Sequence, residues 1–140
     1  VHRARLAYVG HLDALKPALT VRDNLGFWAR FAGGAPDIAA AAVDAGLRRL
    51  QLDHLHNLPA RFLSAGQRRR VNLARLLLKP APLWLLDEPT TALDREAAGI
   101  VAEIIAEHRR GGGMVLAASH VDLGLDGAAV LRLGAARAAA

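Results

Sequence analysis

The chain has 140 residues, carries a net charge of +5, and is 53% hydrophobic but only 4% aromatic. This length allows about one domain with a buried core. Because the chain contains no cysteine, a disulfide framework and thiolate chemistry are excluded. The sequence has no run of roughly 18 apolar residues, so it predicts no membrane-spanning helix. Its arginines are scattered, which predicts no nucleic-acid partner.

The first predicted elements are a short strand and an amphipathic helix. Leu6–Val9 is an apolar run typical of a buried strand, and it is followed closely by His11. Thr20 and Asp23 resemble a capping box with Asp in place of Glu, so a helix is expected from there to about Phe31. The residues expected on its apolar face are Val21, Leu25, Trp28 and Phe31.

Two further helices are expected in the middle of the chain. Pro36 suits a first helical turn and predicts an alanine-rich helix through residues 38–50. The polar stretch at 53–62 is typical of a loop. The next segment leads into a helix at 68–78, which Pro80 ends because proline has no amide donor.

Strands and a helix alternate in the rest of the chain. The apolar run 83–86 predicts a strand buried on both faces. A helix is expected at Arg95–Arg110, and strands at Met114–Ala118 and 129–133. This alternation predicts an α/β fold with a parallel sheet, and we expect both tryptophans in its core. The expected parts are a core strand at 1–11, an α-helical subdomain at 12–78, and the C-terminal half of the core at 79–140.

Polar residues follow three of the predicted strands, at the edge where ligands bind to open α/β sheets. His11 follows the first strand, Asp87 and Glu88 the second, and Ser119 and His120 the third. Asp87 is a candidate ligand of Mg²⁺, which prefers carboxylate oxygens and keeps part of its water shell. Glu88 is a candidate general base for an attacking water. The last of these residues, His120, is a candidate for a hydrogen bond to a γ-phosphate.

A second candidate site lies at the start of the helix expected at 68–78. Ser64 and Gly66 precede this helix, whose N-terminal amides and dipole favour an anion. Taken alone, these two residues are explained equally well as an N-capping serine and a turn glycine. Each of the polar groups after the strands also has an ordinary structural explanation when taken singly. Their joint order and spacing is the informative feature.

This order of segments resembles the ATP-binding-cassette (ABC) ATPases, which have a P-loop NTPase fold. Residues 63–67 resemble the signature loop, and Leu83–Asp87 resembles the Walker B strand. The resemblance implies ATP and Mg²⁺ as cofactors. The roles it implies are catalysis by Glu88 and His120, metal binding by Asp87, and nucleotide contacts by Ser64, Ala65, Gly66, Gln67, His11 and Asp94.

Two departures from the family pattern indicate a subfamily. Ala65 replaces the usual glycine of the signature loop, and His11 replaces a usual glutamine. Both features are similar to the ATPase subunit of cytochrome c maturation haem exporters. That resemblance implies a second ATPase subunit in a homodimer, membrane permease subunits as partners, and a peripheral position at the cytoplasmic face of the inner membrane.

The phosphate-binding loop of the family, Gly-x-x-x-x-Gly-Lys-Ser/Thr, does not occur in these residues. The resemblance places this Walker A loop ahead of the first strand, so we expect the chain to lack the N-terminal part of the ATPase core. Two alternatives remain open. One is a catalytically inactive fragment that acts only as an interaction module, and the other is a different cassette ATPase, of a drug exporter or of a soluble type.

Overall fold

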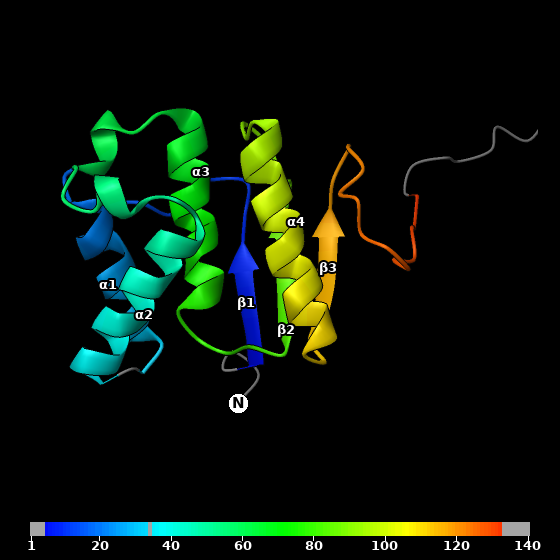
Figure 1. The fold of residues 1–140 in the computed structure, drawn as a ribbon, viewed down its shortest axis with the longest axis horizontal. Coiled ribbons are helices and arrows are strands. Elements are labelled where there is room, and N and C mark those ends of the chain that lie inside the picture. Colours follow the sequence, from blue (N-terminus) through cyan, green and yellow to red (C-terminus); the bar gives the residue numbers. More distant parts are fainter. Residues whose placement is uncertain (1–4, 34, 133–140) are drawn as a thin grey trace, which may run out of the picture.

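A computed structural model describes residues 5–33 and 35–132. Its centre is a parallel sheet of three strands in the order β1-β2-β3. The strands are β1 (Leu6–Val9), β2 (Leu83–Asp87) and β3 (Met114–Ala118). All three point the same way, so their carboxyl ends meet at the upper edge of the sheet in Figure 1. The α/β class and the parallel sheet predicted from the sequence are confirmed.

Helix α4 (Arg95–Arg110) connects β2 to β3 and covers one face of the sheet. Asp94 caps its first turn, and a run of glycines follows its last residue. Trp84 of β2 stacks on His108 of α4 with ring centroids 3.8 Å apart. The bounds of this helix and of the strand that follows it are those expected from the sequence.

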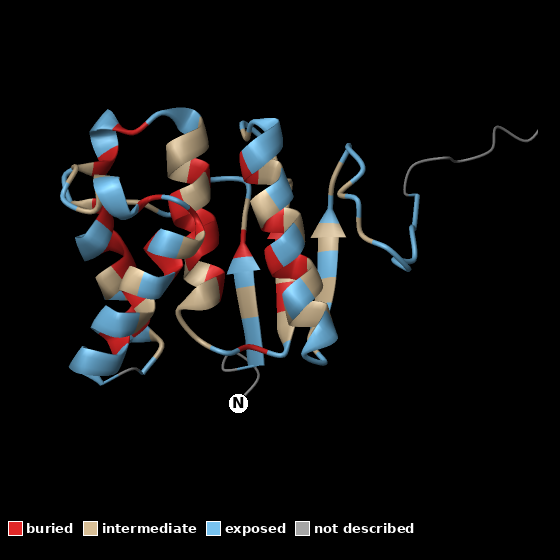
Figure 2. Cartoon of the chain, in the orientation of Figure 1, coloured by how far each residue is buried: buried red, intermediate tan, exposed pale blue. Residues whose placement is uncertain are grey.

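The expectation that the second strand is buried on both faces is wrong for the described part of the chain. Burial alternates along β2, where Trp84 is 4% exposed and Leu86 is 3% exposed, while Leu85 between them is half-buried. On β1, Tyr8 is 55% exposed on the same face as Leu85. The reason is that, in the described part of the chain, α4 covers one face of the sheet, so alternate residues meet this helix and the others do not (Figure 2).

The remaining helices pack together beside the sheet. They are α1 (Val21–Phe31), α2 (Pro36–Arg49) and α3 (Ala65–Ala74), with short 3₁₀ turns at Asp53–Leu55, Ala60–Phe62 and Arg75–Leu77. Their buried faces meet in one hydrophobic core, which continues between the sheet and α4; the buried residues are red in Figure 2. Fully buried members of this core include Val21, Leu25, Val43, Leu47 and Val71.

Helix α3 differs from its predicted span of 68–78. It begins at Ala65 because Ser64 and Gln67 form a capping box there, and it changes to a 3₁₀ turn at Arg75. The first cap, at Thr20, also differs in detail. Thr20 accepts the amide of Asp23, but the Asp23 carboxylate accepts the threonine hydroxyl, because aspartate is too short for the usual return bond.

Two aromatic residues of α1 are more exposed than expected. Phe31 is 77% exposed, and Trp28 is half-buried with its ring covered by the Arg75 guanidinium at 3.8 Å. Trp84 is in the core, as expected.

The strand expected at 129–133 is absent over 129–132, where Val130 is 82% exposed, and Leu133 lies outside the described residues. A strand requires a neighbour for its backbone hydrogen bonds, and residues 129–132 pair with none of the described strands. Within the described ranges, no helix combines the length and the apolar character needed to cross a membrane.

Candidate functional site

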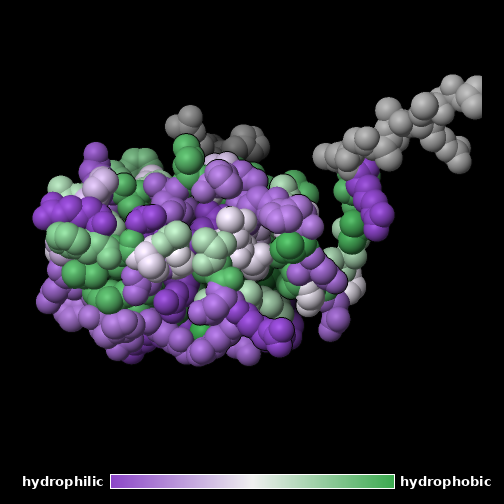
Figure 3. All heavy atoms as spheres, turned by 90° about the horizontal axis from the view of Figure 1, so that it is seen from above, coloured by the Kyte–Doolittle hydropathy of each residue, from purple (hydrophilic) through white to green (hydrophobic). Residues whose placement is uncertain are grey.

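The predicted site residues that follow the strands meet at the carboxyl edge of the sheet. Figure 3 looks down on this edge, and hydrophilic residues cover a large part of it. The backbone amide of His11, after β1, donates to Oδ2 of Asp87 at the end of β2, at 3.2 Å. The Asp87 side chain makes no other hydrogen bond to the described residues. Oδ1 of this half-buried carboxylate is therefore available to a metal ion.

Glu88 and His120 form the closest side-chain pair of the site. Nδ1 of His120 lies 2.8 Å from Oε2 of Glu88, and the His120 amide donates to Oε1 at 3.1 Å. The Glu88 side chain is 23% exposed and that of His120 is 73% exposed. Since both oxygens of the Glu88 carboxylate contact His120, the carboxylate is fixed in orientation, while the His120 side chain remains exposed to solvent. A fixed carboxylate beside an imidazole is suited to accept a proton from a water molecule.

Glu88 adopts a left-handed backbone conformation, with φ of 49°. This conformation costs of the order of 1–3 kcal/mol for a residue other than glycine, so surrounding contacts must hold it. Its amide donates to the Ala118 carbonyl at 2.8 Å, and its carbonyl accepts from the Thr91 amide at 3.2 Å. The same carbonyl accepts a hydrogen bond from Arg69 at 2.7 Å. The turn that presents the candidate base is therefore held from both sides.

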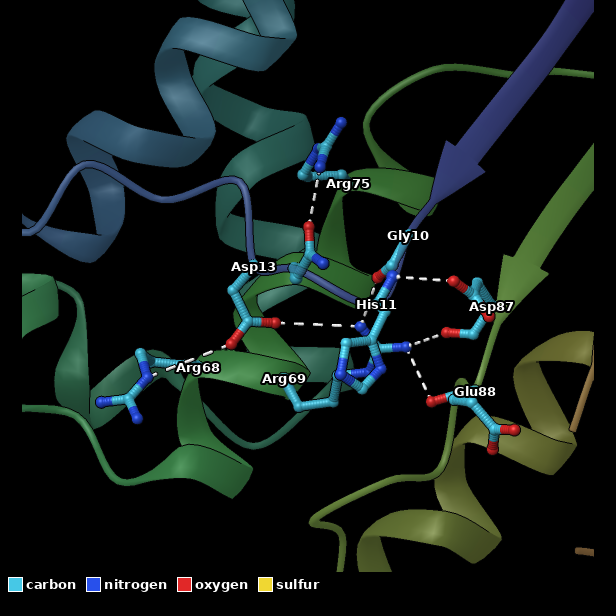
Figure 4. Close-up of polar contacts among 9 residues, drawn as sticks. Gly10, His11, Asp13, Arg68, Arg69, Arg75, Asp87 and Glu88 are labelled. Atoms are coloured by element: carbon cyan, nitrogen blue, oxygen red, sulfur yellow. Dashed lines mark hydrogen bonds and ion pairs between the residues drawn. The ribbon is translucent and has the colours of Figure 1, made fainter. Parts of the chain in front are cut away.

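Arg69, which also holds this turn, is a functional residue that the sequence did not predict, because its scattered arginines were expected to lie in solvent. Arg69 is only 4% exposed. Its guanidinium donates to the carbonyls of Gly10, Asp87 and Glu88 (Figure 4). Burial lowers the pKa of Arg69, and the surrounding carboxylates act in the opposite direction. The available signal was helical spacing, because position 69 precedes the buried Leu73 by four residues.

The predicted signature segment forms the first turn of α3. The Ser64 hydroxyl accepts the Gln67 amide at 3.2 Å, and the Gln67 side chain accepts the Ser64 amide at 2.8 Å. These two bonds satisfy two of the four amides that a helix start leaves open. The amides of Ala65 and Gly66 have no acceptor within the helix, so they are the donors available to an anion.

Gly66 also has a structural reason to be glycine. A Cβ atom at this position would lie 2.7 Å from the Ala92 carbonyl oxygen of the same chain. Besides lying at the predicted anion site, Gly66 is therefore required for the close approach of α3 to the loop after Glu88.

Two other residues at this edge have local roles in the structure. Oδ1 of Asp94 accepts the Ala97 amide at 2.8 Å and thereby caps α4, and its contact with nucleotide stays a prediction. Ser119 does not join the carboxylates, because its hydroxyl bonds to the backbone of Val121.

Mg²⁺ fits this edge only as a companion of phosphate groups. The described residues contain no group of three or more His, Cys, Asp or Glu side chains that could hold a metal ion. Mg²⁺ is commonly bound by one or two carboxylates together with substrate phosphates and water, and Asp87 offers one such carboxylate. The residues therefore fit a metal ion that arrives with a nucleotide.

The chain is similar in sequence to proteins of one family. A profile of the ABC transporter family matches residues 1–91. The cytochrome c biogenesis ATP-binding export protein CcmA of Rhodospirillum rubrum is 54% identical over 94% of this chain. The protein of the same name from Paramagnetospirillum magneticum is 52% identical over 94% of this chain. The chain spans only 55% and 61% of these two relatives.

A solved structure gives a similar result at greater evolutionary distance. It is the dimeric ATP-binding cassette MJ0796 in a post-hydrolysis state, with ADP and phosphate bound. The TM-score is 0.76 at 26% identity, and the match covers 84% of this chain and 53% of the other. The expected P-loop NTPase fold of the ABC type is thereby confirmed.

Proposed function

Since this chain belongs to the ABC transporter family, we propose that it is the larger part of an ATPase subunit that powers export. The observation that carries the proposal is the pair of Glu88 and His120 beside Asp87, at the edge of the sheet where nucleotides bind. Phosphoryl transfer requires mainly that the reacting groups are positioned and their charge stabilised, and these three side chains are positioned by backbone contacts.

In the proposed mechanism the residues of this edge have different tasks. The Glu88 carboxylate accepts a proton from the water that attacks the γ-phosphate. His120 keeps this carboxylate oriented and contacts the γ-phosphate. Asp87 would hold the Mg²⁺ that accompanies ATP, and this ion would supply positive charge beside the phosphates. His11 supports Asp87 through its backbone amide.

The start of α3 supplies the second half of the site. The free amides of Ala65 and Gly66, with the Ser64 hydroxyl, are suited to a γ-phosphate. We assign this contact to the ATP of a second subunit, so two copies of the chain form a homodimer with two composite sites. Support for the dimer comes from the solved ATP-binding cassette, which is dimeric.

The exported substrate and the membrane partners are proposed from the relatives. Their names join cytochrome c biogenesis, ATP binding and export. We therefore propose haem as the substrate, permease subunits as partners, and a peripheral position at the cytoplasmic face of the inner membrane. A second candidate is an interaction module without ATPase activity, and the test below distinguishes it from the first.

The test requires a phosphate-binding loop. We define the extended protein as residues 1–140 placed behind the N-terminal segment of the Rhodospirillum rubrum relative. It is expressed in a Rhodospirillum rubrum strain that lacks this relative, and covalently haem-bearing cytochrome c is measured. We expect restored cytochrome c with the extended protein and none with its Glu88→Gln variant. ATP hydrolysis by the purified extended protein without any restored cytochrome c would instead indicate a different cassette ATPase.

A further inference from the structure

We propose that Arg69 is a positioning residue for hydrolysis. Its guanidinium fixes the backbone turn that presents Asp87 and Glu88, and it fastens this turn to helix α3. The inference rests on the proposed function, since it assigns a role in the same site. Arg69 does not contact the reacting atoms in this role, because all of its hydrogen bonds to described residues go to backbone carbonyls.

The three carbonyls that Arg69 binds come from two different strand ends. Gly10 follows β1, and its oxygen accepts from one terminal nitrogen of the guanidinium at 2.7 Å. Asp87 ends β2 and Glu88 follows it, and the carbonyl oxygens of both accept from the other terminal nitrogen. Figure 4 shows the guanidinium between the two strand ends. A single side chain thus holds the two segments that carry His11 and the candidate catalytic carboxylates.

The contact with Glu88 is important because this residue has a positive φ of 49°. Such a conformation persists only where the surroundings hold it. Without Arg69, the carbonyls of Asp87 and Glu88 lose a buried cationic donor, and the strained turn is free to relax. Relaxation would move the Glu88 carboxylate away from the 2.8 Å contact with His120.

Only arginine can provide all of these contacts together. Its planar guanidinium has five donors in a fixed arrangement, whereas lysine has one nitrogen and binds as a point charge. The side chain is 5% exposed and lies 3.8 Å from the Asp13 carboxylate. The positive charge of Arg69 is therefore buried among backbone oxygens and near a carboxylate, which is a strongly oriented environment.

This arrangement also joins the two halves of the proposed composite sites within one chain. Arg69 lies on the helix that begins at Ala65, and Gly66 of that helix packs closely against the carbonyl of Ala92. Both contacts connect α3 to the segment that starts at Glu88. A displacement of α3 by the nucleotide of a partner subunit would therefore be transmitted to the carboxylate of its own subunit.

The test uses the extended protein with Arg69→Lys and Arg69→Ala, and Arg70→Ala as the matched control. Arg70 is the next residue of α3, and within residues 5–33 and 35–132 its side chain donates only to the Leu50 carbonyl, far in sequence from the site. We expect both Arg69 variants to lower kcat for ATP by about 10–100-fold, part of the 10²–10⁴-fold typical of a general base, and to keep KM within about twofold. Arg70→Ala should keep both parameters.

Chemical rescue separates positioning from simple packing. Guanidinium ion added to Arg69→Ala should restore a measurable part of kcat, because it supplies the missing donors. Urea has nearly the same shape without the charge and should restore nothing. Equal rescue by urea, unchanged kcat in Arg69→Lys, or an equal loss in Arg70→Ala would overturn the proposal.

A second readout does not depend on hydrolysis. The His120 amide donates to Oε1 of Glu88, so its NMR signal reports the position of this carboxylate. We expect the signal to shift in both Arg69 variants and to stay in place in Arg70→Ala. If the extended protein hydrolyses no ATP, the proposed function fails, and this signal alone decides the role of Arg69. An unchanged signal in Arg69→Lys would then contradict it.

Discussion

The carboxylate of Glu88 and the imidazole of His120 lie 2.8 Å apart, although 32 positions separate them in the sequence. The parallel pairing of β2 with β3 brings them together, because the Glu88 amide continues the ladder by donating to Ala118. The proposed catalytic pair is therefore a product of strand register. A slip of one residue in this pairing would direct the following side chains to the other face.

Gly66→Ala should destabilise the extended protein. The new methyl group would lie 2.7 Å from the Ala92 oxygen, closer than packed atoms allow. Overpacking of this kind costs about 1–3 kcal/mol. Gly99→Ala is the matched control, since Gly99 is also helical and a Cβ atom there would meet none of the described residues within 4 Å.

Urea unfolding of both glycine variants measures the difference. Alanine has the higher helix propensity, so Gly99→Ala should raise the free energy of unfolding by about 0.5–1 kcal/mol. Gly66→Ala should lower it. If both substitutions raise it equally, the contact between α3 and the loop at Ala92 is not close.

The 140-residue chain by itself should not hydrolyse ATP. It has Asp87, Glu88 and His120 but no Gly-x-x-x-x-Gly-Lys-Ser/Thr sequence to hold the phosphates. A phosphate-release assay with Mg·ATP tests this, with Glu88→Gln in the same chain as the blank. The expectation would be refuted by turnover within the usual enzyme range of about 1–10³ per second that is absent from the Glu88→Gln variant.

Mixed dimers should distinguish composite sites from sites within one subunit. One extended subunit carries Ser64→Arg and the other carries Glu88→Gln. If each site combines α3 of one subunit with the carboxylates of the other, one site has both lesions and the second has neither. About half of the activity per dimer should then remain, provided that the two sites of the two-fold assembly work independently.

Dimers of wild type with each single variant are the necessary controls. Activity in both controls together with an inactive doubly mutated dimer would show that each subunit uses its own α3. That result would contradict the proposed contact of Ser64 with the nucleotide of the partner.

Features with a strong local signal were predictable from the sequence. The helix Arg95–Arg110 lies between Asp94, which caps it, and three glycines, so both of its ends were expected correctly. The strands Leu6–Val9 and Met114–Ala118 were expected with the bounds that the structure has. The burial expected of Leu6–Val9 is wrong except at Val9, since Leu6 and Tyr8 are exposed. The carboxyl-edge rule for parallel sheets placed Asp87, Glu88 and His120 together without any knowledge of contacts.

Features that depend on tertiary contacts were not predictable in the same way. An apolar run such as 83–86 does not reveal which face the helices cover, and so Leu85 was expected to be more buried than it is. Arginine is usually found at the surface, so the sequence does not indicate that Arg69 is buried. Its burial depends on three carbonyls from segments that are distant in the sequence. The start of α3 was placed late because Gly66 was taken as a turn residue, whereas the capping box of Ser64 and Gln67 includes it in the helix.

Hydrolysis by the Glu88→Gln variant of the extended protein tests the central claim most directly. Glutamine keeps the shape of the side chain but cannot accept the proton, so the variant should still bind ATP while its turnover falls by about 10²–10⁴-fold. Glu103→Gln is the matched control, because Glu103 lies on the exposed side of α4 with a side chain 70% exposed. Phosphate release measured for both variants at saturating Mg·ATP should show the loss only at position 88. Full turnover in Glu88→Gln would contradict the assignment of Glu88 as the base.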